Sequence, residues 1–174
     1  MIKTQRLFLR RFTKDDWQDL YEYLSDPDVV KHEPYDPISE EQAKEWTGYR
    51  VDSTDFFAVC LNNESGKMIG NVYFAKQEFD TYEIGYVFNK TYWGKGYARE
   101  AAAAVIKNAF LHEGAHRVTA NCNPENAPSW QLLERIGMKR EGHLRKNIYF
   151  KTDAGGVPIW QDTYIYGMLK EDMK

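Results

Sequence analysis

Hydrophobic and polar residues in the first part of the chain follow a strand-like pattern and then a helical one. Residues 5–12 alternate in polarity, which predicts a strand. Thr13 is expected to cap a helix, because hydrophobic side chains then recur at helical spacing until Asp26-Pro27, where the proline ends the helix. Ser39 and Gln42 form the signature of a capping box at the start of another helix. These patterns predict one strand followed by two helices.

The rest of the chain alternates between short apolar runs and two amphipathic stretches. Three strands are predicted first, then a helix that Gly114 ends, a strand, a helix that Gly137 ends, and two last strands. The predicted ranges, in that order, are residues 56–61, 68–76, 82–89, 94–113, 117–122, 126–136, 138–150 and 160–169. This order of elements predicts an α/β fold with a mixed sheet.

Length and charge restrict the possible classes of protein. The chain has 174 residues, which favours one domain over residues 1–174 with a substantial core. Its net charge of -3, without a basic stripe, argues against a nucleic-acid partner. No run approaches the ~20 apolar residues of a membrane span, and residues 1–6 lack the apolar run that is typical of a signal peptide. We therefore expect a cytoplasmic protein with no membrane partner.

The cysteines give no sign of a metal site. Cys60 and Cys122 lie far apart in two apolar runs, where buried thiols are expected. The sequence contains neither a CxxC nor an HExxH spacing, so no metal is predicted.

A segment with two glycines connects a predicted strand to a predicted helix: Trp93-Gly94-Lys95-Gly96-Tyr97-Ala98-Arg99. Backbone N–H groups point outward at the start of a helix, and the helix dipole favours an anion there. Glycines let the main chain approach a diphosphate closely. The spacing fits neither a dinucleotide fingerprint, which needs a third glycine where Arg99 stands, nor a Walker A loop, which needs a glycine where Asn89 stands. Taken alone, the segment is as typical of an ordinary strand-to-helix turn as of a phosphate-binding loop.

A second segment of interest, Asn123-Pro124-Glu125-Asn126-Ala127-Pro128-Ser129, precedes the last predicted helix. Asn126 suits an N-cap and Pro128 suits a first helical turn. By itself, this segment is therefore well explained by a purely structural role.

Read together, several motifs resemble the GNAT superfamily of N-acetyltransferases, in the RimJ/RimL-like branch that acetylates the N-terminal alanine or serine of ribosomal proteins. The resemblance extends over nearly the whole chain. Its motifs are Thr4-Gln5-Arg6-Leu7-Phe8-Leu9-Arg10, Glu83-Ile84-Gly85-Tyr86, Gly94-Lys95-Gly96-Tyr97-Ala98, Asn126-x-x-Ser129, Glu134-Arg135-Ile136-Gly137-Met138 and Trp160-Gln161-Asp162. It implies a mostly antiparallel, seven-stranded sheet flanked by about four helices. The fourth and fifth strands of that sheet are expected to splay apart.

The resemblance also implies that the chain binds acetyl-CoA as a cosubstrate. The pantetheine arm is expected between the splayed strands, paired with Tyr86, Val87 and Phe88, with a backbone N–H near Val87 facing the thioester oxygen. Gly85 suits the bulge that the splaying needs, although plain close packing explains this glycine as well. The diphosphate is expected on backbone N–H groups of the residues Trp93, Gly94, Lys95, Gly96, Tyr97, Ala98 and Arg99.

The same resemblance suggests residues that handle protons. Asn126 and Ser129 match the family's pantetheine-contacting pair. Many GNAT enzymes have a tyrosine four residues before the glycine that ends this helix, where it protonates the departing thiolate, but this chain has Leu133 there. Ser129 is therefore the expected proton donor. The attacking amine must be neutral, and Glu83 is the expected base, acting through water, although a surface ion pair explains that carboxylate as well.

The acceptor amine is expected between residues 29–38 and the turn-rich residues 153–158. Aromatic and acidic side chains there suit a primary amine, either at a peptide N-terminus or on a small molecule. The residues expected to hold the amine are His32, Glu33, Tyr35 and Asp162.

Two alternative functions stay open. The acidic residues near 33–41 suit an enzyme that acetylates a polyamine or an antibiotic, and Leu133 suits a non-catalytic acyl-CoA-binding module. Because the family is often dimeric, a homodimer is also possible.

Overall fold

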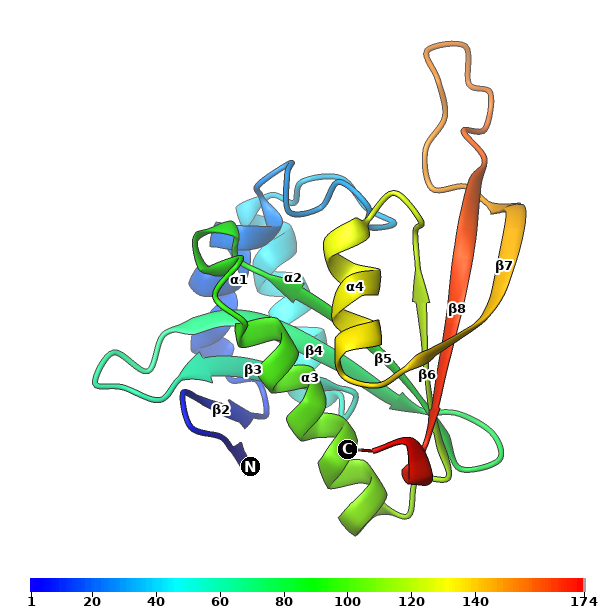
Figure 1. The fold of residues 1–174 in the computed structure, drawn as a ribbon. Helices are drawn as coiled ribbons and strands as arrows, with labels where there is room; N and C mark the ends of the chain where they lie inside the picture. Colours follow the sequence, from blue (N-terminus) through cyan, green and yellow to red (C-terminus); the bar gives the residue numbers. More distant parts are fainter. Residues whose placement is uncertain (174) are drawn as a thin grey trace.

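A single mixed sheet extends through the structure, and helices cover both of its faces (Figure 1). The computed structural model describes residues 1–173. Its strands are β1 (Ile2–Lys3), β2 (Leu7–Arg10), β3 (Phe56–Leu61), β4 (Met68–Lys76), β5 (Thr81–Phe88), β6 (Arg117–Cys122), β7 (Lys139–Ile148) and β8 (Gln161–Leu169). They lie side by side in the order β1-β2-β3-β4-β5-β6-β8-β7. Within the described residues, only β5 and β6 pair in parallel, and every other pair of neighbouring strands is antiparallel.

Helices pack on the two faces of the sheet and form two separate cores. The α-helices are α1 (Trp17–Leu24), α2 (Glu40–Asp52), α3 (Tyr97–Asn108) and α4 (Ala127–Arg135). α1 and α2 bury one face and α3 and α4 bury the other, as Figure 1 shows. Among residues 1–173, no helix has both the length and the apolar composition needed to cross a bilayer.

Local sequence signals set the ends of several helices as predicted. The Ser39 hydroxyl accepts from the Gln42 backbone N–H at 3.2 Å, and the Gln42 side chain accepts from the Ser39 N–H at 2.9 Å, so the capping box is complete. α3 continues in a π-helical turn over Ala109–Glu113, which ends at Gly114 with a φ of +71°. Gly137 follows α4 with a φ of +99°. Both glycines adopt the left-handed conformation that a side chain disfavours.

The mixed, mostly antiparallel fold is confirmed, and the number of strands needs one correction. Seven strands were expected, and within residues 1–173 the sheet has eight. The additional strand, β1, has two residues and pairs with β2. Two residues are too few to show a period, so the pairing is visible only in the structure.

The predicted splaying is present, but it needs no bulge. β5 pairs with β6 over residues 81–83 and 117–119 only, and beyond them the two strands separate. The register between β4 and β5 is constant from Gly70 to Lys76, so Gly85 lies in a regular ladder. A Cβ atom at Gly85 would be 3.8 Å from Tyr73, an ordinary contact. The expected bulge at Gly85 is therefore wrong, because β5 follows β4 throughout while β6 diverges.

Candidate active site

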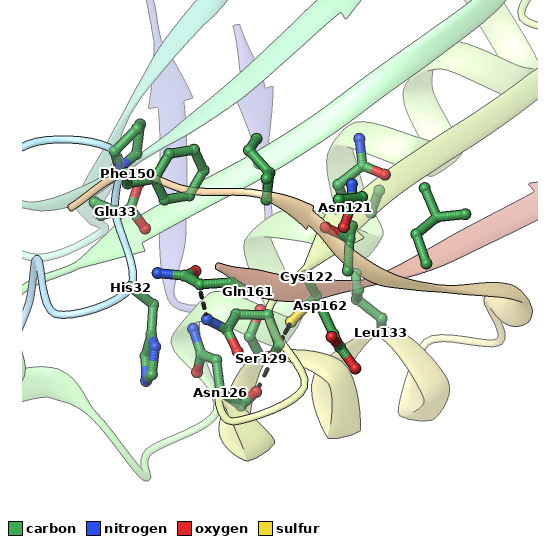
Figure 2. Close-up of a pocket in the computed structure, with 18 of the residues that line it drawn as sticks. His32, Glu33, Asn121, Cys122, Asn126, Ser129, Leu133, Phe150, Gln161 and Asp162 are labelled. Carbon is green, nitrogen blue, oxygen red and sulfur yellow. Dashed lines mark hydrogen bonds between the residues drawn. The ribbon is translucent and has the colours of Figure 1, made fainter. Parts of the chain in front are cut away.

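The separated ends of β5 and β6 bound a cavity of about 410 Å³. Ile84, Gly85 and Tyr86 line it from β5, and Asn121 and Cys122 line it from β6. Its other walls are α4 and the residues before it, the loop after α1, and the adjoining ends of β7 and β8 with Phe150 between them. Figure 2 shows His32 and Glu33 entering from the loop, with Asn126 and Ser129 on α4. Segments that are far apart in sequence, from the loop after α1 to β8, thus meet where the sheet opens.

The start of α3 has the backbone features of an anion-binding turn. Gly94 and Gly96 have φ values of +73° and +80°, and no heavy atom lies within 4 Å of the place where a Cβ atom of Gly94 would stand. The N–H groups of the first helical turn have no partner within the helix. An open, glycine-built main chain at the positive end of a helix dipole fits the diphosphate of acetyl-CoA. The expected diphosphate residues therefore share one exposed strand-to-helix turn.

Side chains of this turn stabilise the turn itself. The Trp93 indole Nε1 donates to the Phe88 carbonyl at 2.8 Å, which ties the loop to the end of β5. The Lys95 ammonium donates to the Thr91 carbonyl at 3.0 Å, so it folds back on the loop. Tyr97 packs under the guanidinium of Arg6, whose carbon lies 4.5 Å from the ring centroid. These contacts engage the Trp93, Lys95 and Tyr97 side chains within the protein itself.

Glu100 connects this turn to the beginning of the chain. Its carboxylate accepts from the Arg6 side chain at 2.7 Å, the Arg6 backbone N–H at 2.9 Å and the Thr4 hydroxyl at 2.6 Å. These hydrogen bonds lower the pKa of Glu100, although its partial burial acts in the opposite direction. Arg6 also donates to the Lys95 carbonyl at 2.9 Å. Thr4 and Arg6 of the opening motif therefore hold the glycine turn in place through Glu100 and the Lys95 carbonyl.

The start of α4 supplies side chains to the cavity. Asn126 occupies the N-cap position, but its side chain makes no capping hydrogen bond and lines the cavity instead. The structural explanation of Asn126 is therefore incomplete, because the side chain that could cap the helix faces the open space. Ser129 lies in the first turn of α4, and its side chain also lines the cavity.

A tyrosine from β5 reaches the candidate proton donor. The Tyr86 hydroxyl donates to the Ser129 carbonyl at 3.0 Å and lies 3.2 Å from Ser129 Oγ. Burial raises the pKa of Tyr86 above its ordinary value, so the phenol stays protonated. Tyr86 was expected to contribute its backbone only. Nothing in the sequence links its hydroxyl to Ser129, because the two residues are 43 positions apart.

Leu133 replaces the tyrosine that many GNAT enzymes have on this helix. Its side chain is buried and lines the cavity. A leucine neither donates nor accepts a proton, so the hydroxyl groups at this wall are those of Tyr86 and Ser129. Cys122 lies beside them, and burial raises the pKa of its thiol, which keeps it neutral. Both Cys122 and Cys60 are free and buried, as predicted.

The loop after α1 brings a carboxyl group and an imidazole to the cavity. Burial raises the pKa of Glu33 to about 7, and a hydrogen bond with Tyr35 and the positive charge of Arg50 only partly offset this rise. Burial, with the nearby charge of Lys31, lowers the pKa of His32. At neutral pH, this wall therefore presents an uncharged imidazole and a carboxyl group that is close to its titration point.

Three of the four expected acceptor residues line the cavity. They are His32, Glu33 and Asp162. Asp162 is engaged by other groups, because its carboxylate accepts from the Lys146 backbone N–H at 2.8 Å and lies 2.6 Å from His143 Nε2. These contacts lower the pKa of Asp162.

The other expected acceptor residue, Tyr35, lies outside the cavity lining. Its ring packs edge-on against Trp46 of α2, with the centroids 4.9 Å apart. Burial raises the pKa of Tyr35 above its ordinary value.

Glu83 lies at the paired end of β5. Its carboxylate accepts from Asn121 Nδ2 at 3.1 Å, and it is not among the residues that line the cavity. The neighbouring position, Ile84, is buried and does line it. The catalytic assignment of Glu83 stays a prediction.

Comparisons with known proteins agree with this architecture. A family model described as an acetyltransferase (GNAT) domain matches residues 6–139. An uncharacterized N-acetyltransferase, YnaD of Bacillus subtilis (strain 168), is 41% identical over 173 residues, covering 98% of this chain and 98% of YnaD. A GNAT-family acetyltransferase from Bacillus anthracis, known from its crystal structure, is 40% identical, with a TM-score of 0.88 and 98% of each chain covered.

Relatives with named substrates are more distant. The [ribosomal protein uS5]-alanine N-acetyltransferase of Escherichia coli (strain K12) is 25% identical over 185 residues, covering 98% of this chain and 91% of that protein. A spermidine N-acetyltransferase from Vibrio cholerae, solved in complex with CoA and spermine, is 17% identical with a TM-score of 0.79. The match covers 97% of this chain and 98% of the spermidine N-acetyltransferase chain, and at 17% identity it shows a shared fold alone.

Proposed function

This chain belongs to the GNAT acetyltransferase family, and on that premise we propose that it acetylates the primary amine at a protein or peptide N-terminus. It is an N-acetyltransferase, and enzymes of this family use acetyl-CoA. The finer assignment concerns the acceptor. One observation carries it: the cavity offers a single carboxyl group that is free to meet one cation.

The cavity has two acidic residues, and only one of them is available. Asp162 is occupied by His143 and by the backbone N–H of Lys146. Glu33 forms no ion pair within residues 1–173. A peptide N-terminus carries one ammonium group, whereas a polyamine carries several and needs several carboxylates.

The acidic residues outside the cavity are partly neutralised. Asp36 pairs with Lys151 at 3.3 Å, and Glu40 pairs with Lys44 at 2.6 Å. The acidic character of residues 33–41, which favoured a polyamine on sequence grounds, is therefore reduced by neighbouring lysines.

An exposed apolar hairpin adjoins the cavity and fits the residues that follow a peptide N-terminus. The segment between β7 and β8 projects beyond the sheet (Figure 1). Its exposed apolar side chains are Tyr149, Phe150, Val157, Ile159 and Trp160. Such rings provide contact area for the side chains of a peptide. The similarity to an alanine N-acetyltransferase of a ribosomal protein supports the same acceptor class.

The cavity and the glycine turn divide the binding of acetyl-CoA between them. The turn from Trp93 to Arg99 would hold the diphosphate, and the unpaired edge of β5 would hold the pantetheine arm, with Asn126 and Ser129 opposite. Acetyl-CoA supplies an acetyl thioester, which a neutral amine attacks directly. Ser129 would provide the proton that the sulfur takes as the carbon–sulfur bond breaks.

The experiment that tests this proposal is acetyl transfer to a defined set of amines. Purified protein is incubated with acetyl-CoA and with peptides beginning in alanine or serine, the same peptides with a blocked N-terminus and one lysine, spermidine, or an aminoglycoside. Acetylated products are identified by mass spectrometry. Products confined to the free N-termini support the proposal. Products confined to spermidine or the aminoglycoside contradict it, and acetyl-CoA binding without any product indicates a non-catalytic module.

A further inference from the structure

We propose that the carboxylate of Glu33, rather than that of Glu83, accepts the proton that the acceptor amine loses before acetyl transfer. This inference rests on the proposed function, because it names the base for that reaction. It moves the base from the sheet to the loop that follows α1.

The loop holds Glu33 firmly at the cavity. The backbone N–H of Glu33 donates to the Val30 carbonyl at 2.9 Å. A few residues later, the Ile38 N–H donates to the Leu24 carbonyl at 3.1 Å, which ties the loop to the end of α1. Val30 and Ile38 are both buried in the core under α1 and α2. The side chain of Glu33 is thus presented by an anchored turn.

Glu33 faces the wall that carries the candidate proton donor. Glu33 and Ser129 line the same cavity from opposite segments (Figure 2). Cys122 of β6 lines the cavity between them, and the charge of Glu33 is a small contribution to the raised pKa of its thiol, after burial as the main cause. A proton acceptor on one wall and a proton donor on the other is the arrangement that acetyl transfer to an ammonium needs.

Glu83 does not line the cavity. It lies where β5 and β6 are still paired, opposite Thr119 in the register. Its carboxylate is bonded to Asn121, and the cavity lining begins one residue later, at Ile84. Its partner Asn121 lines the cavity, so Asn121 stands between the Glu83 carboxylate and that space.

The surroundings of Glu33 suit a base at neutral pH. Two neighbouring groups lower the pKa of Glu33: the Tyr35 hydroxyl of the same loop and the positive charge of Arg50 in α2. Cys122 of β6 faces Glu33 as well, and the charge of Glu33 raises the pKa of its thiol slightly. Burial is the largest influence, and the resulting pKa of about 7 balances the two protonation states. A base is most effective when its pKa lies near the working pH. No ion pair joins Arg50 to Glu33 within residues 1–173, and the Arg50 guanidinium donates to Asn71 at 3.2 Å.

The proton transfers balance as follows. The ammonium R–NH3+ gives one proton to the Glu33 carboxylate and becomes a neutral amine. Its lone pair forms a bond to the acetyl carbon, and the carbon–sulfur bond breaks with its electron pair leaving on sulfur. The sulfur takes a proton from Ser129, and the second proton of the amine nitrogen restores the serine hydroxyl. Glu33 then releases its proton to water.

The size of the effect depends on the basicity of the amine. Without a base in the enzyme, only acceptor amines that are already neutral in solution can react. At pH 7 the neutral fraction is about one in ten for an N-terminal amine with a pKa of ~8, and about one in 2,500 for an alkylamine with a pKa of ~10.4. Glu33→Gln is therefore expected to lower kcat/KM by about 10-fold for a peptide N-terminus and by up to about 1,000-fold for any alkylamine that reacts.

The test measures kcat/KM against pH for the wild-type enzyme and for Glu33→Gln, Glu83→Gln and Glu45→Gln, with an alanine-initiated peptide as the probe. Glu45 is an exposed residue of α2 and serves as the matched control. The wild-type profile is expected to rise through pH 7, whereas the Glu33→Gln profile is expected to lack this step and to rise only through ~8, the pKa of the peptide amine itself, with its affinity for acetyl-CoA unchanged. Loss of the rise in Glu83→Gln, with Glu33→Gln unchanged, overturns the proposal.

A second measurement separates this inference from the proposed function. The carboxyl carbon of Glu33 is followed by NMR in 13C-glutamate-labelled protein, assigned by its absence in Glu33→Gln. If the wild-type enzyme acetylates no peptide, the proposed function fails. Titration of Glu33 near its ordinary value of 4.5 then overturns this inference as well, and titration near 7 still supports a carboxyl group able to act as a base.

Discussion

The two halves of the β5–β6 strand pair have different structures and different consequences. Residues 81–83 pair in register with residues 117–119, and the side chains of Tyr82 and Val118 are buried there. In the other half, the same two strands separate and a cavity of about 410 Å³ lies between them. The paired half joins the two parts of the sheet, and the open half provides the candidate active site.

This difference shows how one element can serve stability and function. A paired strand satisfies its backbone groups within the sheet, whereas an unpaired strand edge must meet water or a ligand. The open edge of β5 therefore offers hydrogen-bonding groups to an extended ligand such as the pantetheine arm. Substitutions in the paired half should change stability more than activity, and substitutions in the open half should do the reverse.

The largest effect is expected for Ser129→Ala in the open half. Removing the hydroxyl removes the proposed proton donor, so turnover is expected to fall about 100-fold while the Kd for acetyl-CoA changes less than about 3-fold. Steady-state kinetics and calorimetric titration measure the two quantities. Ser65→Ala, in the exposed turn between β3 and β4, is the control. Unchanged turnover with weakened acetyl-CoA binding would reduce Ser129 to a binding residue.

Val118→Ala tests the paired half. The Val118 side chain is 0% exposed, so its truncation is expected to cost on the order of 2 kcal/mol of unfolding free energy, measured in urea. Val87→Ala in the open half is the counterpart, since Val87 is only half-buried and should cost less than about 1 kcal/mol. Equal losses at the two positions would contradict the distinction between the halves.

Glu33→Gln is expected to change how stability depends on pH. The folded protein holds the Glu33 proton up to about pH 7, whereas the unfolded chain releases it near the ordinary value of 4.5. The folded state therefore binds more protons within this window, and the wild-type stability contributed by Glu33 falls as pH rises through it. At pH 8 the variant should be more stable than the wild type by roughly 1–2 kcal/mol, and at pH 4 it should be equal. Urea unfolding at both pH values measures the difference, and a constant difference would contradict the burial of this carboxyl group.

The smallest effect is expected at the glycine turn beside the open half. Gly94→Ala and Gly114→Ala place a side chain at φ values of +73° and +71°, with no atom within 4 Å in either case, so both should cost about 1 kcal/mol of stability. Only Gly94 lies at the start of α3. Its substitution should also raise the Kd for acetyl-CoA by about 5- to 10-fold, because the turn loses the shape that faces the diphosphate. Equal Kd values in the two variants would place the diphosphate elsewhere.

The local parts of the fold could be predicted because their causes are local. The capping box at Ser39 and the glycine at 114 each act within one or two helical turns, and the structure contains both as expected. The two-residue strand β1 was missed because it exists only through its pairing with β2. The bulge expected at Gly85 was wrong because strand separation comes from the divergence of β6 and not from β5 itself.

The candidate site shows the same division. The sequence alone determined the order of elements, the family, and the residues of the two strand-to-helix turns, since these depend on motifs of neighbouring residues. Only the tertiary structure decided which side chains meet in the cavity: it placed the Tyr86 hydroxyl against Ser129, engaged Asp162 with His143, and brought Glu33 inside while leaving Glu83 outside. Burial and proximity between distant segments set these contacts and the pKa of Glu33, and neither quantity is encoded in the spacing of residues along the chain.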